Sequence, residues 1–176
     1  MSGRPVGTSV TSRGSLRPRL VTDWATRGGT IRPVGNSSDL DDLIALRLAW
    51  KPASDDTQAD ALADDMRSWW ERNGAGRRAW IARGAGGIPV GMANAAIFER
   101  MPVPGTGSAR WIYVANVFVL PEHRRQGIAA DLMNALVEWA RAEGMVRIVL
   151  APSEMSIPFY ASLGFRPADD LMRLDL

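Results

Sequence analysis

The strongest constraint on the fold is a long apolar run at residues 110–120, which reads Arg-Trp-Ile-Tyr-Val-Ala-Asn-Val-Phe-Val-Leu and which Pro121 closes. A run of this length, rich in β-branched and aromatic residues, is typical of a strand that is covered on both faces. A helix is expected next, over 127–143, because apolar residues recur there at helical spacing: Ile128, Leu132, Leu136 and Trp139. A second short apolar run follows at 147–151. Strand, helix and strand in such close succession predict a right-handed βαβ crossover and one parallel strand pair.

The rest of the chain adds further elements on both sides of this crossover. They are an edge strand at 30–34, helices from Ser37 or Ser38 to Trp50 and from Thr57 to Asn73, hairpin strands at 78–82 and 90–98, a short helix at 156–162 and a last, antiparallel strand at 165–176. The sequence therefore predicts a mixed α/β fold, with a mostly antiparallel central sheet, one parallel βαβ crossover and helices on both faces.

The chain has 176 residues, a length that suits one domain. Residues 1–29 are rich in Gly, Ser, Thr, Pro and Arg without an apolar period, so we expect a flexible basic tail there and the domain at 30–176. A net charge of only +2 excludes the basic field of a nucleic-acid binder. The chain has no apolar run of signal or membrane-spanning length, so we expect a cytoplasmic protein without a membrane partner.

The absence of cysteine excludes disulfides, thiolate metal sites and a cysteine nucleophile, and we expect no metal. The turn at 124–129, Arg-Arg-Gln-Gly-Ile-Ala, lies between the long strand and the helix. Unpaired N–H groups at the start of a helix form an anion site, and Gly127 would let a phosphate approach the main chain. On spacing alone, an ordinary turn with two solvated arginines is an equal alternative.

Two motifs together resemble a known family. Residues 117–129, Val-Phe-Val-Leu-Pro-Glu-His-Arg-Arg-Gln-Gly-Ile-Ala, resemble the V-x-P-x-x-R-x-x-G-x-G/A signature of the GCN5-related N-acetyltransferases. Residues 159–165, Phe-Tyr-Ala-Ser-Leu-Gly-Phe, resemble that family's later F-Y-x-x-L-G-F signature. The resemblance is strong from Val114 to Phe165 and is absent in the tail.

The resemblance implies that acetyl-CoA is the co-substrate and that an amine, on a small molecule or a peptide, attacks the thioester directly. It implies main-chain contacts to the pantetheine arm from Val117, Phe118 and Val119. It also implies a pyrophosphate site formed by the amides of Arg124, Arg125, Gln126, Gly127, Ile128 and Ala129. Ser153 lies where relatives often place an Asn that touches the cofactor. Tyr160 would protonate the leaving thiolate, although packing beside Phe159 and Phe165 is the alternative role.

The chain departs from the family pattern at the general base. Many relatives carry a carboxylate on the central strand, but this stretch reads Val114-Ala115-Asn116. Glu99 and Glu154 are candidates, each with a solvated surface charge as the alternative, and His123 is expected to be a surface residue. A water chain, or an amine with a low pKa, would remove the need for a base.

The acceptor side is predicted to lie over the first two helices, which are acidic and aromatic. Their candidate residues are Asp55, Asp56, Asp60, Asp64, Asp65, Trp50, Trp69 and Trp70. In one interpretation, the aspartates attract a cationic amine and the tryptophans form a wall for it. In the other, the aspartates are solvated on a helix face and the tryptophans fill the core. Two other functions stay open. One is a non-catalytic acyl-CoA-binding regulatory domain. The other is a nucleotide-phosphate binder, although the sequence has no Walker lysine after the glycine. A homodimer is also open, since relatives often form one.

Overall fold

The computed structural model describes residues 24, 28–105 and 109–175. Its sheet has the strand order β1-β2-β3-β4-β5, formed by Thr30–Pro33, Arg77–Arg83, Pro89–Glu99, Arg110–Val119 and Ile148–Leu150. Its α-helices are α2 (Ser37–Trp50), α3 (Asp56–Asn73), α4 (Ile128–Ala142) and α5 (Ile157–Ser162). All strand pairs are antiparallel except β4–β5. The predicted fold class is confirmed, and so are the edge strand and the parallel crossover.

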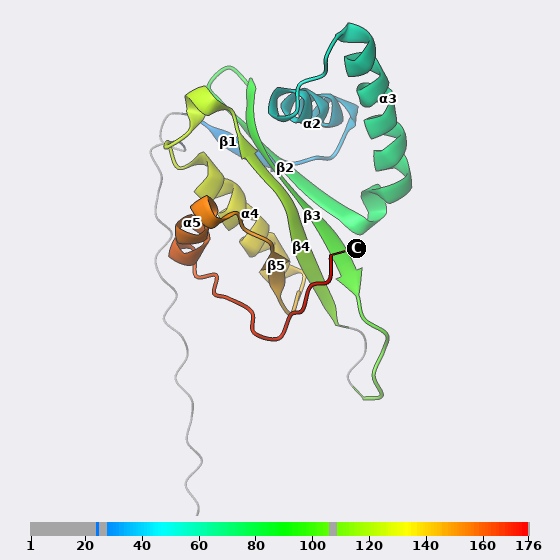
Figure 1. Ribbon diagram of the computed structural model, residues 1–176, viewed down its shortest axis with the longest axis vertical. Coiled ribbons are helices and arrows are strands. Elements are labelled where there is room, and N and C mark those ends of the chain that lie inside the picture. Colours follow the sequence, from blue (N-terminus) through cyan, green and yellow to red (C-terminus); the bar gives the residue numbers. More distant parts are fainter. Residues whose placement is uncertain (1–23, 25–27, 106–108, 176) are drawn as a thin grey trace, which may run out of the picture.

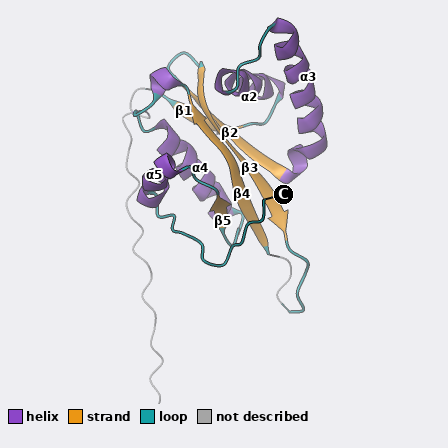
Figure 2. Ribbon diagram, in the orientation of Figure 1, coloured by secondary structure: helices purple, strands orange, loops and turns teal. Residues whose placement is uncertain are grey.

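The helices form a layer on each face of the sheet, with α2 and α3 on one face and α4 and α5 on the other (Figure 1; Figure 2). The α4 face holds the larger core cluster, in which Ile128, Leu132 and Leu136 are at most 1% exposed. On the other face, Leu43 and Leu46 of α2 pack against Phe118 of β4. The apolar stripe at helical spacing therefore does place α4 on the sheet, as predicted.

A β-bulge interrupts the β3–β4 ladder, where Asn94 pairs with Asn116 and Ala95 pairs with Val114. The extra residue is Ala115, which is exposed. Because side chains alternate between faces along a strand, one extra residue reverses which positions face α4. Ile112 and Val114 belong to the α4-face core before the bulge, and Val117 and Val119 pack there after it. The bulge thus sets the direction of every side chain near the end of β4.

Strands β4 and β5 pair only over a short stretch. Their register ends where Val114 meets Leu150, whereas β4 continues to Val119. Within the described ranges, no strand pairs with the 115–119 segment on its β5 side. This segment therefore presents main-chain polar groups at an opening between two parallel strands, next to the turn at 124–129.

Three expectations are corrected by the structure: the N-cap of α2, the last strand and the position of Trp24. Asn36, rather than Ser37 or Ser38, caps α2, and its Oδ1 accepts the N–H of Asp39 at 2.9 Å. The last strand is absent over 165–175, a segment that contains Pro167 and two consecutive aspartates, both of which are unfavourable in a strand. The first correction concerns a helix cap and the second concerns strand composition, and apolar spacing reports neither.

Trp24 is the third correction, because it lay in the predicted tail but is only 6% exposed. It belongs to the α4-face core, and its main-chain oxygen accepts the N–H of Gly29 at 3.2 Å. Its ring meets that of His123 edge-on, with 6.4 Å between centroids. The rest of the predicted tail, residues 1–23 and 25–27, lies outside the described residues.

Candidate active site

The turn after β4 is fixed to the end of the strand by several hydrogen bonds. Leu120 N–H donates to Val90 O at 2.9 Å, and the short 3₁₀ helix Pro121–His123 follows. Arg124 N–H donates to Pro121 O at 3.3 Å, and Arg124 Nε donates to Val119 O at 3.1 Å. The main chain and the side chain of Arg124 therefore both hold the start of the turn in place.

Two residues of the turn have left-handed backbone conformations, Arg125 with φ 60° and Gly127 with φ 83°. A residue with a side chain costs of order 1–3 kcal/mol in this region, so the conformation of Arg125 is strained. Glycine at 127 adopts it without that cost. Residues in this conformation cluster at ligand-binding loops, so the strain of Arg125 supports the hypothesis of a binding site at this turn.

Most main-chain donors of this turn have no partner among the described residues. Gly127 is the N-cap of α4 and provides no side-chain cap, and the first helical bond runs from Asp131 N–H to Gly127 O at 3.0 Å. Within the described part of the chain, the N–H groups of residues 125–130 donate to no other residue. Arg124 is different, because its N–H is already donated to Pro121.

These donors lie at the positive end of the α4 dipole, between left-handed positions that turn successive N–H groups toward one concave side. The exposed side chains of Arg124 and Arg125 add positive charge. Such an arrangement binds phosphate or diphosphate without any further side chain. Its residues fit the pyrophosphate of a nucleotide cofactor.

The predicted pantetheine residues lie at the open part of β4. Val117 and Val119 direct their side chains to the α4-face core, and Phe118 directs its ring to the opposite face. There the ring stacks on Trp50 with 5.6 Å between centroids and an interplanar angle of 13°. The buried side chains hold the strand rigid, while its main-chain edge toward β5 has no strand partner among the described residues.

Tyr160 lies on α5 and is half-buried between two other aromatic rings. Its centroid is 4.9 Å from that of Phe159 and 5.7 Å from that of Phe165, both edge-on. Burial raises the pKa of the Tyr160 phenol above its ordinary value, at which a phenol already carries its proton at neutral pH. Its hydroxyl makes no hydrogen bond within the described ranges, and it therefore has a proton to donate.

Ser153 follows β5 and closes the turn into α5. Its Oγ donates to Ser156 Oγ at 3.0 Å, and its carbonyl accepts from Ser156 N–H at 2.9 Å and Ser156 Oγ at 2.8 Å. The hydrogen bonds between Ser153 and Ser156 thus stabilise this turn. Glu99 and Glu154, the two candidate bases, are exposed, whereas His123, which was expected to be a surface residue, is partly buried with its ring against Trp24.

One polar side chain near this opening was missed by the sequence analysis. Asn94 on β3 is only 9% exposed, and its Oδ1 is buried without a hydrogen-bond partner in the described part of the chain. It faces Asn116 across the ladder, at the bulge. An amide inside the otherwise apolar stretch from Met92 to Ile97 was the available signal.

Several aspartates of the two acidic helices have structural roles. Asp55 caps α3 by accepting Gln58 N–H at 2.8 Å, and Asp64 pairs with Arg67 at 3.2 Å. Asp39 binds Arg83 at 2.7 Å, and the Gly35 N–H, together with Arg83, holds the pKa of Asp39 below its ordinary value although burial opposes this. These contacts favour the structural alternative for this part of the predicted acceptor surface.

Two of the three tryptophans of the predicted acceptor surface lie close to arginines. The Arg47 guanidinium lies 5.1 Å from the ring centroid of Trp50, and the Arg77 guanidinium lies 4.6 Å from that of Trp69. Trp70 packs on the α2-face core. A ring that already carries a guanidinium is a poor site for a second cation.

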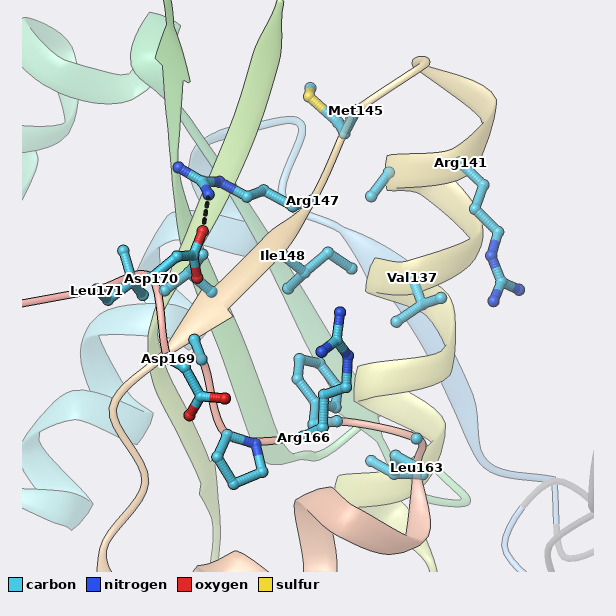
Figure 3. A pocket seen from close by; sticks show the side chains of 16 residues that line it. Val137, Arg141, Met145, Arg147, Ile148, Leu163, Arg166, Asp169, Asp170 and Leu171 are labelled. Carbon is cyan, nitrogen blue, oxygen red and sulfur yellow. Dashed lines mark hydrogen bonds and ion pairs between the residues drawn. The ribbon is translucent and has the colours of Figure 1, made fainter.

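A cavity of about 620 Å³ lies away from the turn, between the second half of α4, β5 and the segment after α5 (Figure 3). Arg147 pairs with Asp170 across it at 3.2 Å, and Arg166, Val137 and Ile148 also line it. It includes neither Tyr160 nor residues 124–129. We therefore do not assign the cofactor to it.

Among the residues that the structure places, no group of His, Asp and Glu could hold a metal ion. No helix in the same part of the chain has the length and apolar character needed to cross a membrane.

Comparison with known proteins is consistent with this geometry. The profile of the Acetyltransferase (GNAT) family matches residues 40–165. Glucosamine 6-phosphate N-acetyltransferase of Trypanosoma brucei brucei is 41% identical over 64 residues, which cover 36% of this chain and 44% of that protein. N-acetyltransferase family 8 member 2 of Rattus norvegicus is 33% identical over 113 residues, or 62% of this chain and 46% of that protein. The matches thus span somewhat less than half the length of these relatives.

Solved structures share the fold over most of the chain. A Trypanosoma brucei acetyltransferase has a TM-score of 0.61 at 28% identity, covering 84% of this chain and 99% of its own. An aminoglycoside antibiotic 6'-N-acetyltransferase of Acinetobacter baumannii has a TM-score of 0.63 at 26% identity, covering 85% and 98%. A predicted acetyltransferase of Clostridium acetobutylicum, solved with acetyl-CoA, has a TM-score of 0.62 at 22% identity, covering 84% and 96%.

Proposed function

The chain belongs to the acetyltransferase (GNAT) family, and on this premise we propose that it is an acyltransferase that moves an acetyl group from acetyl-CoA to an amine. The observation that carries the choice of donor is the set of main-chain N–H groups at 125–130, which have no partner within the described ranges at the start of α4. These donors suit the diphosphate of CoA, and the Clostridium acetobutylicum protein of the same fold binds acetyl-CoA.

The open edge of β4 would receive the pantetheine arm. Main-chain groups of Val117, Phe118 and Val119 would pair with its amides as an added strand does. Because the diphosphate and the arm approach from the same end of the sheet, the thioester would lie near the bulge. A main-chain N–H there would polarise the thioester carbonyl and hold its negative charge during attack. Arg124 would contribute through its guanidinium, since its own N–H is already used.

The reaction would be a direct transfer. The amine nitrogen forms a bond to the carbonyl carbon, the carbon–sulfur bond breaks, and sulfur leaves with the electron pair. Tyr160 would donate the phenolic proton to sulfur, and water would return to Tyr160 the proton lost by nitrogen. The phenol of Tyr160 is protonated beforehand at neutral pH, since burial moves its pKa upward from a value that already lies above neutrality. A neutral amine therefore gives an amide and a free thiol, with no net proton released.

The acceptor is proposed to be a primary amine of a small molecule or a peptide. Relatives are named for acetylation of glucosamine 6-phosphate and of aminoglycosides, so amino sugars are the first candidates. The cytoplasmic location and the oligomeric state stay predictions.

The test uses the full chain with acetyl-CoA and a panel of four amines: glucosamine 6-phosphate, neamine, spermidine and a lysine peptide. We expect CoA thiol release that depends on one class of amine, with the acetylated product identified by mass spectrometry. Calorimetric binding of acetyl-CoA without turnover on any amine would favour the regulatory alternative. Failure to bind CoA at all would contradict the assigned donor.

A further inference from the structure

The amide of Asn94 is an unusual feature of the sheet. Asn94 lies in the middle of β3, between Ala93 and Ala95, which are both fully buried in the α4-face core. Its own side chain points to the opposite face, as does that of Met92, which packs in the α2-face core. In this setting Oδ1 is buried and accepts no hydrogen bond within the described part of the chain.

A buried carbonyl oxygen without a donor is costly, at about 1–3 kcal/mol. Cores avoid such groups, and one that persists in a native structure calls for an explanation, such as an ordered water, an ion or a role in binding or catalysis. A residue that served only the core would be apolar here, because Met92 and Phe118, its neighbours along the strands on this face, are apolar. The structure therefore provides an acceptor atom that lacks a donor among the described residues.

Asn94 Oδ1 lies near the opening at which the thioester is proposed to bind. Asn94 pairs with Asn116, which is next to the bulged residue Ala115 and lies in the segment of β4 that has no described strand on its β5 side. Beyond α2, this face of the sheet becomes more accessible, since Asn116 and Tyr113 are both partly exposed. Two carboxamides thus face each other beside the opening proposed for the thioester, on the face away from α4.

We propose that Asn94, with Asn116 opposite, binds the acceptor amine. Its Oδ1 accepts one N–H of a primary amine and turns the nitrogen lone pair toward the thioester carbonyl. A carboxamide oxygen accepts a hydrogen bond but takes no proton at neutral pH, so Asn94 would orient the acceptor amine and leave proton removal to water. This inference rests on the proposed function and adds to it the group that positions the acceptor.

The experiment compares Asn94→Leu with Asn94→Asp in the full chain. Leu has nearly the shape of Asn without its oxygen, whereas Asp keeps an acceptor oxygen. Asn134→Leu, on α4, is the matched control. The probe is the amine of the panel that the unsubstituted chain acetylates best. For Asn94→Leu we expect kcat/KM for the amine to fall about tenfold or more, with KM for acetyl-CoA unchanged. Asn94→Asp restores part of this loss, and the control behaves as the unsubstituted chain.

Thermal unfolding separates this role from a structural one. Because no bond is lost, Tm of Asn94→Leu is expected to stay the same or to rise. A lowered Tm would show that the amide has an internal partner, and unchanged kinetics for the amine would show that it does not touch the acceptor. Either result overturns the inference and leaves acetyl transfer intact. If the unsubstituted chain binds CoA but acetylates no amine of the panel, the proposed function fails, and the role of Asn94 fails with it.

Discussion

Replacing Gly127 with Ala tests whether the turn before α4 binds a diphosphate. Gly127 has φ 83°, a conformation in which an L-residue costs about 1–2 kcal/mol. The new Cβ also lies at the N-cap of α4, beside the N–H groups that would contact the anion. Loss of one hydrogen bond to a charged group is worth about 1.5–3 kcal/mol, which corresponds to a CoA Kd that is about 10- to 150-fold weaker.

Gly144→Ala is the matched control at the other end of the same helix. Gly144 has φ 69°, and a Cβ added there would meet no heavy atom within 4 Å beyond its chain neighbours, so its variant carries the same strain but no ligand. Both variants are expected to lower Tm by about 2–8 °C, as follows from 1–2 kcal/mol in a domain of this size. Only Gly127→Ala is expected to weaken CoA binding in calorimetry. Equal affinities for CoA in the two variants would refute the assignment of the turn.

Two further predictions concern the acid and the acidic helix. Tyr160→Phe is expected to lower kcat by about 10²- to 10⁴-fold with little change in KM for acetyl-CoA, as steady-state kinetics can measure; an unchanged kcat would limit Tyr160 to packing beside Phe159 and Phe165. Asp39→Asn is expected to destabilise the fold by about 1.5–3 kcal/mol at pH 7, because Asp39 binds Arg83 and Gly35 as a carboxylate. The folded-state pKa of Asp39 is lowered, so this stabilisation is present above the unfolded value of about 3.9 and is lost as the pH falls through the folded value. Denaturant unfolding from pH 7 to pH 2 measures it, and a difference that persists at pH 2 would contradict this origin.

The sheet and its crossover could be predicted because their signals are local. The apolar run that forms β4 and the helical stripe of α4 both have a period that can be read without knowledge of the partners. The cap of α2 could not be predicted from local signals in the same way. Asn36, Ser37 and Ser38 are all suitable caps, and only the packing of the helix decides that Asn36 is the one used. The predicted strand after Phe165 also could not be decided from local signals, because a strand needs a partner at the sheet edge as well as a suitable composition.

The candidate site divides in a similar way. The turn at 124–129 carries a motif, and the sequence therefore located it. Asn94 carries none, because an isolated amide in a strand becomes informative only when its oxygen is seen to lack a donor among the described residues. Trp24 was assigned to the tail because a single aromatic residue among Gly, Ser and Thr has no period, although its ring contacts His123.

The central claim is that main-chain donors at the start of α4 bind the diphosphate of CoA. Titration of ¹⁵N-labelled protein with CoA, and separately with pantetheine, which lacks the diphosphate, measures this at individual amides. We predict that CoA shifts the amide resonances of Gly127 and Ile128 strongly, whereas pantetheine shifts mainly those of Val117 to Val119. Shifts confined to the cavity beside β5, around Arg147 and Arg166, with Gly127 and Ile128 unmoved, would contradict the account.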